Sequence, residues 1–406
     1  MTSEIRTAAI AYDCLFPYTT GGGERQYRAF AEDIARRGIG VDYLTSDWRD
    51  EQVAAEFRVI PVCGSLSLYD VRGVRRSPAA LQFAFGLFRH LVRRRGRYDV
   101  LIVSGLPVLN VFAARCALWR SRTNVVVDYL EVWGRRQWVQ YAGKLTGNLA
   151  WALQRMAIAM TPVATCHSQL SARRLRSEGL RGRMLVSPGL IDGDGGTSAT
   201  VVSTTAPPYV LFVGRHIPDK QVEILPAAVA EARKHVPDLR LIILGEGPTS
   251  SLVDSAIDEA DAASWTQRPG FVSQERLDTL MAGAACLVNP SRREGYGLVV
   301  VESAAHGTPV VLVADQGNAS TELIDNGVNG FVSPSTDPRA IATCIVRTIE
   351  GGNPLRASTR AWYDDALTTR TIARTVDGIL AAVTRDESPE TNGLRSGRQR
   401  RKDADA

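Results

Sequence analysis

Short apolar segments alternate with amphipathic segments through both halves of this 406-residue chain. The apolar segments have the length of buried strands, and the amphipathic segments have the length of helices. Strands and helices that alternate in this way form right-handed β–α–β units with parallel strands. A stretch rich in Gly, Ser, Thr and Pro, from Gly193 to Pro208, separates the halves and is typical of a linker. The pattern predicts an α/β protein with two doubly wound domains facing each other across a cleft.

The predicted elements follow from apolar runs for strands and from longer periodic stretches for helices. The predicted strands lie at 7–12, 40–44, 57–62, 100–103, 124–128, 162–166, 184–187, 209–213, 239–244, 286–289, 309–313 and 330–332. The predicted helices include 24–37, 78–95, 143–160, 222–234, 250–261, 273–284, 300–306 and 320–326, and the chain is helical from about 351 to 383.

Composition is ordinary for a globular protein, with 45% hydrophobic and 22% charged residues. No uninterrupted apolar run reaches the ~18 residues that a membrane span needs, and the chain begins with a strand-like segment rather than a secretion signal. The six cysteines are scattered without a C-x-x-C pair, which favours buried thiols over metal ligands or disulfides. These features predict a cytoplasmic protein with no metal site, with peripheral contact at the inner membrane face as a variant.

Charge is distributed unevenly: Lys and Arg exceed Asp and Glu in residues 1–192, and the reverse holds in residues 193–384. A basic first half can attract an anionic acceptor or a membrane surface, or opposite charges can help two domains face each other. The segment 81–97 is apolar and then strongly basic. It fits an interfacial helix or, more commonly, a core-facing helix with a solvated basic end. Nucleic-acid binding is not expected, because the basic residues lack interleaved aromatics and a known motif spacing.

Two carboxylates stand eight residues apart in the segment 293–302. Glu294 is expected in a loop, and Glu302 in the first turn of the helix that follows Gly297. The loop amides and the helix N-terminus would point at one spot, which suits an anion and above all a diphosphate. Two acids beside that spot can hold the hydroxyls of sugars on either side. The segment therefore predicts a nucleotide-sugar site.

A second cluster of charge lies on the loop after the first predicted strand of the second half. Arg215 and Lys220 are five residues apart there, and the chain has only four lysines. Loop Arg and Lys are usually just solvated. Beside the paired glutamates, however, this pair is well placed to neutralise a diphosphate leaving group.

Two further turns follow predicted strands of the second half. Gly245–Pro248 contains Glu246, and Pro269–Ser273 contains Phe271 and Val272. Each is either a plain turn or a segment that holds a nucleotide base through backbone groups.

Three glycines, Gly21 to Gly23, stand between the first predicted strand and the first predicted helix. Glycine lets a backbone approach a phosphate closely, and a helix N-terminus favours the anion. The spacing is not G-x-G-x-x-G, because Gln26 occupies the third glycine's position, which speaks against a nicotinamide enzyme.

Taken together, these motifs resemble the retaining glycosyltransferases of family 4, also called glycosyl transferases group 1, which have the GT-B architecture of two Rossmann-like domains. The resemblance covers the chain from residue 7 to about residue 345. The matching pieces are Gly21–Gly23, Gly214-Arg215 with Pro218 and Lys220, Gly245–Pro248, Glu294-x7-Glu302 with Ala304 to Val311, and Asp325 to Gly330.

The resemblance implies a role for each matching position. Arg215 and Lys220 would hold the diphosphate, Glu294 the transferred sugar and Glu302 the ribose diol. Gly22 and Gly23 would approach the diphosphate from the other domain. The remaining donor contacts would come from Glu246, Phe271, Val272, Gly295, Tyr296, Gly297, Leu298 and Val299.

The same resemblance divides the chain. Residues 1–193 would form an acceptor-binding domain and 208–360 the nucleotide-sugar domain, with 194–207 as the linker. A helix at 361–384 would pack back on the first domain, and 385–406 would be a disordered tail.

One position departs from the family. Members usually carry a histidine at the end of the first-domain strand that faces the reacting sugar, and here Leu130 stands in that place. Asp128 or Glu131 would then supply the polar contact, or the acceptor would. His167, after a later strand, is a further alternative, although a lone histidine there is more often structural.

The implied reaction moves a sugar from a UDP- or GDP-linked donor to a hydroxyl acceptor, with retention, no cofactor and no metal ion. The acceptor would be a specialised metabolite or a cell-envelope glycan or glycolipid precursor, and the oligomeric state stays open. Two other readings remain: a nucleotide-sugar epimerase on the same architecture, and a catalytically weak protein that only binds nucleotide-sugar. A pyridoxal-dependent phosphorylase would need a buried lysine in the second half, where only Lys220 and Lys234 occur.

Overall fold

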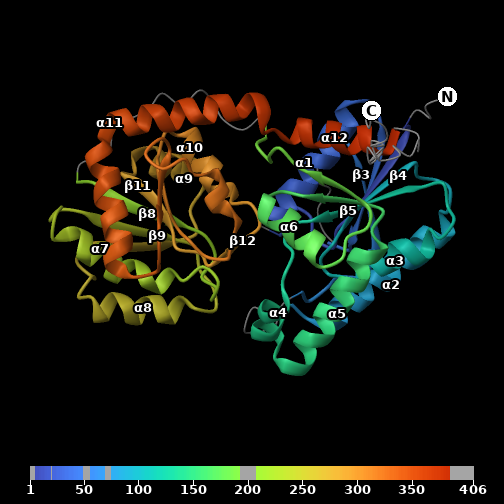
Figure 1. Ribbon diagram of the computed structural model, residues 1–406, viewed down its shortest axis with the longest axis horizontal. Helices are drawn as coiled ribbons and strands as arrows, with labels where there is room; N and C mark the ends of the chain where they lie inside the picture. The colour runs from blue at the N-terminus through green and yellow to red at the C-terminus, as the bar shows by residue number, and fades with distance from the viewer. Residues whose placement is uncertain (1–4, 20, 49–54, 69–74, 193–206, 385–406) are drawn as a thin grey trace, which may run out of the picture.

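A computed structural model describes residues 5–19, 21–48, 55–68, 75–192 and 207–384. Two parallel sheets, each packed between helices, form two domains that lie side by side (Figure 1). The predicted α/β class and the two doubly wound domains are thereby confirmed. The predicted tail, and the predicted linker except for its last residue, lie outside the described residues.

The first sheet has seven parallel strands in the order β3-β2-β1-β4-β5-β6-β7. The strand order reverses between β1 and β4, and ligands of such sheets bind at this point, beyond the carboxyl ends of the strands. The strands are β1 Thr7–Ala11, β2 Gly40–Ser46, β3 Arg58–Cys63, β4 Val100–Ser104, β5 Asn124–Tyr129, β6 Val163–Cys166 and β7 Arg183–Val186.

Helices cover both faces of this sheet. The buried side chains of α1 belong to one apolar core, and those of α2, α3, α5 and α6 belong to another. The helices are α1 Gly22–Arg36, α2 Ser77–Arg93, α3 Leu109–Ala117, α4 Arg135–Ala142, α5 Lys144–Met160 and α6 Gln169–Ser177.

The second sheet has six parallel strands in the order β10-β9-β8-β11-β13-β15. They are β8 Tyr209–Val213, β9 Arg240–Leu244, β10 Thr266–Gly270, β11 Cys286–Asn289, β13 Val310–Val313 and β15 Gly330–Ser333. Around them lie the 3₁₀ turns η1 Val222–Ile224 and η2 Ala319–Leu323 and the helices α7 Leu225–Arg233, α8 Ser250–Glu259, α9 Gln274–Gly283 and α10 Leu298–Ala305.

The end of the described chain returns to the first domain (Figure 1). Helix α11, Pro338–Thr369, bends at Gly352, and α12, Ile372–Thr384, lies against α1. Arg37, directly after α1, donates from Nη2 to the Ala373 carbonyl at 2.9 Å. The second domain is therefore tied to the first by more than the segment between the sheets.

Several elements differ from the predictions: helices α3, α4 and α6 were not predicted, and two further differences have a clear physical reason. Edge strand β10 was not predicted, because its sequence is polar and contains Pro269, and proline is tolerated only at sheet edges. The helix predicted at 320–326 is the 3₁₀ turn η2, where the Asn318 side chain accepts from the Ser320 amide at 3.1 Å. Asparagine bonding of this kind favours turns over helix.

Among the described helices, none combines the length and apolar character of a membrane-spanning segment.

Candidate functional site

Glu294 lies in a two-residue strand, β12 (Arg293–Glu294), and not in the predicted loop. This strand pairs in parallel with β14, Gly317–Asn318, and so has a fixed position. Glu294 Oε1 accepts hydrogen bonds from Lys220 Nζ and, at 3.1 Å, from Asn289 Nδ2. Burial alone would raise the pKa of Glu294, but the Lys220 ammonium and these hydrogen bonds hold it below its usual value. The structure thus joins two predicted site residues in one ionised pair.

The Gly-Tyr-Gly turn after Glu294 has no room for side chains at its glycines. A Cβ added at Gly295 would lie 2.2 Å from the carbonyl oxygen of Leu130 in the other domain. Gly297 has φ +102°, in the left-handed region, and precedes α10. Between them, the hydroxyl of buried Tyr296 accepts from the Leu190 amide at 3.2 Å. The turn therefore presents its backbone to the interface at the two glycines, and Tyr296 reaches the first domain through its side chain.

Helix α10 begins at Leu298, two residues earlier than predicted. Glu302 consequently lies in the second turn rather than the first. The opening amides, those of Leu298 and Val299 among them, have no acceptor inside the helix, which suits an anion. Arg25 of the first domain donates from Nη1 to Glu302 Oε1 at 2.7 Å. Burial raises the pKa of Glu302, and the Arg25 charge opposes that shift.

The glycine loop of the first domain faces the same helix. A Cβ added at Gly22 would lie 3.2 Å from Leu298 Cδ1, and one added at Gly23 would lie 3.0 Å from Leu130 Cδ1. The glycines, the end of β5 and the start of α10 therefore meet in one place. Leu130, the residue that the resemblance sets in the histidine's place, therefore lies against Gly23.

Asp128 occupies the interior of the first domain and does not face this meeting point. Its carboxylate is fully buried and contacts Gln26 Nε2 at 3.0 Å, His167 Nε2 at 2.8 Å and Thr165 Oγ1 at 2.5 Å. Burial would raise the pKa of Asp128, but His167 and the hydrogen bonds hold it below its usual value. Asp128 and His167 therefore belong to a buried polar network rather than to an exposed binding surface.

Glu131 lies at the edge between the domains. It accepts from Trp133 Nε1 at 2.6 Å and lies 3.7 Å from Arg293 Nε. The Arg293 guanidinium also stacks 3.7 Å from the centre of the Trp133 ring and pairs with Asp219. Burial raises the pKa of Glu131, with Arg293 opposing. Of the two acids predicted to replace the histidine, Glu131 is the one beside the strand that carries Glu294.

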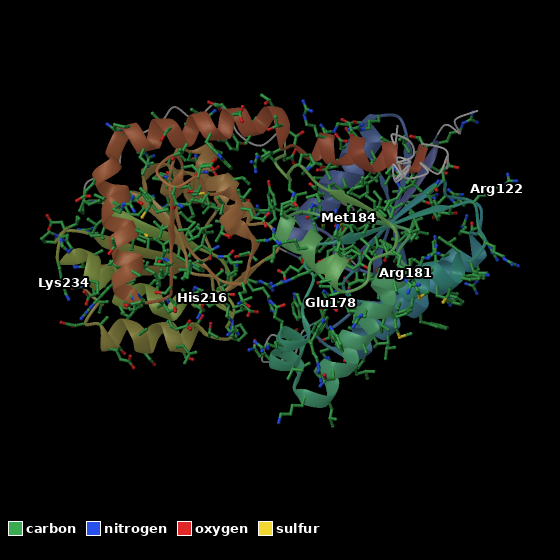
Figure 2. The ribbon with its side chains drawn as sticks, in the orientation of Figure 1. Arg122, Glu178, Arg181, Met184, His216 and Lys234 are labelled. Carbon is green, nitrogen blue, oxygen red and sulfur yellow. The ribbon has the colours of Figure 1, made fainter. Side chains whose placement is uncertain are left out.

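Arg215 is exposed on the loop after β8 that also carries Lys220. The neighbouring His216 is buried instead and lies 3.0 Å from Ser250 Oγ through Nδ1. Figure 2 labels His216 within the second domain.

The two turns predicted beside a nucleotide base lie close together. A Cβ added at Gly270 would be 2.9 Å from Glu246 Oε1. Phe271, which follows Gly270, is 72% exposed. An exposed aromatic ring beside a carboxylate offers both a stacking surface and an acceptor to a base.

Two residues of this site, Arg25 and Arg293, were not predicted. Both stand next to predicted motifs, Arg25 two residues after Gly23 and Arg293 directly before Glu294. The only sequence feature that could have pointed to these two arginines is their position beside residues already predicted to bind the donor.

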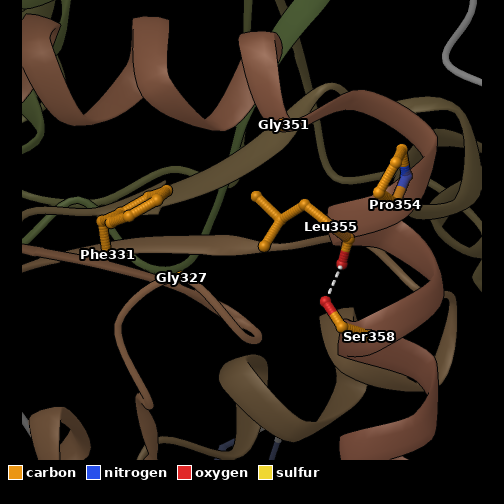
Figure 3. A pocket seen from close by; sticks show the side chains of 6 residues that line it. All are labelled: Gly327, Phe331, Gly351, Pro354, Leu355 and Ser358. Atoms are coloured by element: carbon orange, nitrogen blue, oxygen red, sulfur yellow. Dashed lines mark hydrogen bonds between the residues drawn. The ribbon is translucent and has the colours of Figure 1, made fainter.

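A cavity of about 280 Å³ lies elsewhere, between β15 and the bend of α11 (Figure 3). Its lining is mostly apolar, and its Ser358 hydroxyl already donates to the Val328 carbonyl at 2.6 Å. It contains none of the predicted site residues. Within the described ranges, no group of three His, Cys, Asp or Glu side chains is arranged to hold a metal ion.

Two family models match the chain. "Glycosyl transferase 4-like domain" matches residues 21–189, and "Glycosyl transferases group 1" matches residues 207–351. The first model thus covers most of the first domain, and the second covers the second sheet and its helices.

Curated relatives match over shorter segments. The α-D-kanosaminyltransferase of Streptomyces kanamyceticus is 30% identical over 35% of this chain and 36% of its own. The D-inositol 3-phosphate glycosyltransferase of a Nocardioides species is 33% identical over 35% of this chain and 34% of its own. The matched segments thus span only about a third of these relatives.

Solved structures match over nearly the whole chain. Sucrose-phosphate synthase of Thermosynechococcus elongatus superposes with TM-score 0.70 at 19% identity, covering 93% of this chain and 96% of its own. Anabaena HepE in complex with UDP-glucose superposes with TM-score 0.69 at 16% identity, covering 93% of this chain and 99% of its own. At these identities the likeness shows the fold. Through the two family models and this two-domain fold, the chain belongs to the glycosyl transferases of group 1, family 4, with the GT-B architecture.

Proposed function

We propose that the protein is a retaining glycosyltransferase that moves a sugar from a UDP- or GDP-linked donor to a hydroxyl acceptor. One observation carries the proposal: Lys220 and Glu294 form one ionised pair beside the backbone turn that opens α10. A basic group and a helix N-terminus suit a diphosphate, and an ionised acid next to them suits a sugar hydroxyl. Several relatives are named as sugar transferases, which supports the proposed function.

In the proposed mechanism the basic groups stabilise the leaving diphosphate. Negative charge grows on the diphosphate as the glycosidic bond breaks, and Arg215, Lys220 and the α10 amides would receive it. The diphosphate can then take the acceptor's proton on the same face, which retains the configuration. We propose that these groups make a divalent ion unnecessary.

The acceptor class is part of the proposal. The relatives' names include small polyol acceptors and lipid acceptors alike: inositol 3-phosphate, phosphatidylinositol mannoside and diacylglycerol. We keep both a specialised metabolite and an envelope precursor as candidates. The six free thiols fit a reducing cytoplasm.

Activity would be measured as nucleoside diphosphate release from UDP- and GDP-sugars, with and without acceptor extracts and with added chelator. Arg215→Ala should lower turnover by roughly two to three orders of magnitude, as loss of an oxyanion donor does. Arg240→Ala, an exposed arginine at the opening of β9, is the matched control. Conversion of the donor into a sugar isomer without transfer would favour the epimerase. Donor binding without turnover by any acceptor would favour the binding protein.

A further inference from the structure

Helix α2 carries a second apolar stripe on the side away from its core. The stripe's side chains are spaced by four, three and four residues, which places them on one face of a helix. They are Leu81 (58% exposed), Phe85 (68%), Phe88 (38%) and Val92 (47%). The opposite face of α2 is already buried in the first domain. The stripe is therefore not needed to hold the helix in place.

Helix α5 repeats this arrangement with the same spacing. Its outward side chains are Leu145 (90% exposed), Leu149 (61%), Ala152 and Met156 (56%). Its inward residues Ala157 and Ile158 are buried in the core that α2 also uses. Two helices of one layer thus expose parallel apolar stripes to solvent.

The two stripes belong to one surface. Helix α3 packs along α2 and also contacts α5, and Figure 1 shows the three helices on one side of the first domain. After α3, Trp119 is 63% exposed, and its carbonyl oxygen accepts from the Arg95 guanidinium beyond α2. Within the described chain, this surface holds eight of the eleven large apolar side chains that are exposed. We call the outer side of α2, α3, α5 and Trp119 the apolar face.

The rim of the apolar face is basic. Neither α2, α3 nor α5 contains an Asp or Glu residue. Figure 2 shows Arg122 at the outer edge of the first domain. Arg155 is partly neutralised, because Glu178 lies 3.7 Å from its Nε. The exposed basic side chains on and around the face are Arg89, Arg93, Arg94, Arg120, Arg122, Lys144 and Arg155; Arg97, beyond α2, lies 3.4 Å from Asp42 instead.

We propose that the apolar face docks on an anionic lipid bilayer, with its leucines and phenylalanines in the headgroup–acyl boundary and its arginines on the phosphates. Apolar stripes flanked by basic residues bind in this way, and each basic residue near such a surface contributes. A second copy of the chain is a poorer partner, because a two-fold contact through this face would set arginines against arginines. The proposal does not depend on the transferase reaction.

Co-sedimentation of the full chain with vesicles tests the proposal. The vesicles contain phosphatidylcholine alone or phosphatidylcholine with phosphatidylglycerol. We expect binding to the anionic vesicles at least about tenfold stronger than to the neutral ones, and weaker binding in high salt, which screens the arginines. Equal binding to both vesicles, or binding to neither, would overturn the proposal.

Paired variants separate the contribution of the apolar side chains to vesicle binding from that of the arginines. Leu81→Ser with Phe85→Ser and Leu149→Ser should abolish sedimentation, whereas Leu252→Ser, an exposed leucine on α8, should not. Arg93→Gln with Arg94→Gln should weaken binding roughly fivefold per residue. The same pair of changes at exposed Arg240 and Arg339 of the second domain should have no effect. A nucleotide-sugar thermal shift that persists in every variant shows that the fold is intact.

Cys116 offers a probe that needs no new cysteine. It is the exposed one of the six cysteines and lies on α3 within the apolar face. Cys63 is half-buried, and burial raises the pKa of its thiol to about 11, which slows its labelling at neutral pH. An environment-sensitive dye on Cys116 should shift to the blue with anionic vesicles, and Cys116→Ser should lose the label. A blue shift without vesicles that grows with protein concentration, with a dimer by light scattering, would instead assign the face to self-association.

Discussion

Both acids of the candidate site already have a basic partner, but the two partners come from different places. Lys220 reaches Glu294 from within the second domain, so that pair is part of a preformed half-site. Arg25 reaches Glu302 from the first domain, and the side chains of this pair are 45% and 35% exposed. A ribose diol that binds Glu302 has to displace Arg25. The Arg25–Glu302 pair therefore links the two domains, and under the proposed function it would compete with a ribose diol for Glu302.

Replacing Arg25 tests this competition. Arg25→Ala should raise donor affinity by up to about fivefold, because an exposed ion pair is worth at most about 1 kcal/mol. Calorimetric titration with the donor measures the change. Arg28→Ala, on the same helix and paired with Glu32 instead, should leave affinity unchanged. A loss of affinity in Arg25→Ala would show that Arg25 itself binds the donor.

The buried Asp128–His167 pair gives a stability prediction. Asp128→Asn should destabilise the protein by about 3 kcal/mol at neutral pH, because it removes one partner of a buried pair. Asp238→Asn, at an exposed position, should cost less than about 0.5 kcal/mol. Thermal unfolding of wild type, Asp128→Asn and Asp238→Asn, each with nucleotide present, measures the two differences in stability.

The pH dependence of the stability difference between wild type and Asp128→Asn follows from the direction in which folding shifts the pKa of Asp128. The folded pKa of Asp128 is lowered, so its ionised form stabilises the protein above the unfolded pKa of about 3.9. This contribution is lost as pH falls through the folded value. The gap between wild type and Asp128→Asn should therefore be full from pH 7 to 5 and shrink in stronger acid. A gap that stays constant below pH 4 would contradict the assignment.

At the scale of elements, the site depends on two backbone segments that meet between the domains. The Gly-Tyr-Gly turn before α10 packs on the end of β5, and the two glycines that open α1, Gly22 and Gly23, pack on Leu298 and Leu130. The contacts are made mainly by backbone and by Leu130 and Leu298, with Glu131 Cγ 2.8 Å from a Cβ added at Gly295. Their role is to let backbone amides approach a shared ligand.

Gly295→Ala tests the first of these contacts. The added Cβ would meet the Leu130 carbonyl at 2.2 Å, so the domains could not close fully. Turnover should fall about a hundredfold, the usual effect of a displacement near 1 Å at a reacting centre. Nucleotide affinity should change less than about threefold, because the proposed base and ribose contacts lie in the second domain away from Leu130. If Gly295→Ala kept normal turnover, the reaction would not need the close contact between Gly295 and the Leu130 carbonyl.

The elements also show what could be predicted from sequence. Strands β8 and β11 have the predicted bounds, because each is a short, buried and mostly apolar run between turns. Helix α3, nine residues that follow Pro107 closely, was not predicted, because a short helix has little periodicity to detect. Within the site, Glu294 and Lys220 could be assigned by motif. The Arg25–Glu302 contact joins residues 277 positions apart, and no local pattern encodes such a contact.

At the scale of the whole molecule, the uneven charge found in the sequence separates into two features. Some first-domain arginines face the second domain's acids, as Arg25 faces Glu302 and Arg173 lies 3.9 Å from Glu322. Others gather around the apolar face, away from the other domain. The two explanations considered from sequence, domain pairing and attraction of an anionic surface, thus concern different arginines.

The most direct test compares nucleoside diphosphate with monophosphate binding by calorimetry, for uridine and guanosine nucleotides. Because Arg215, Lys220 and the start of α10 would hold the second phosphate, wild type should bind the diphosphate at least about tenfold more tightly. Arg215→Ala and Lys220→Ala should each reduce that ratio toward one while monophosphate affinity stays within about twofold, and Arg240→Ala should leave both unchanged. If both variants kept the wild-type ratio, the diphosphate would not lie at this loop, and the proposed site would be wrong.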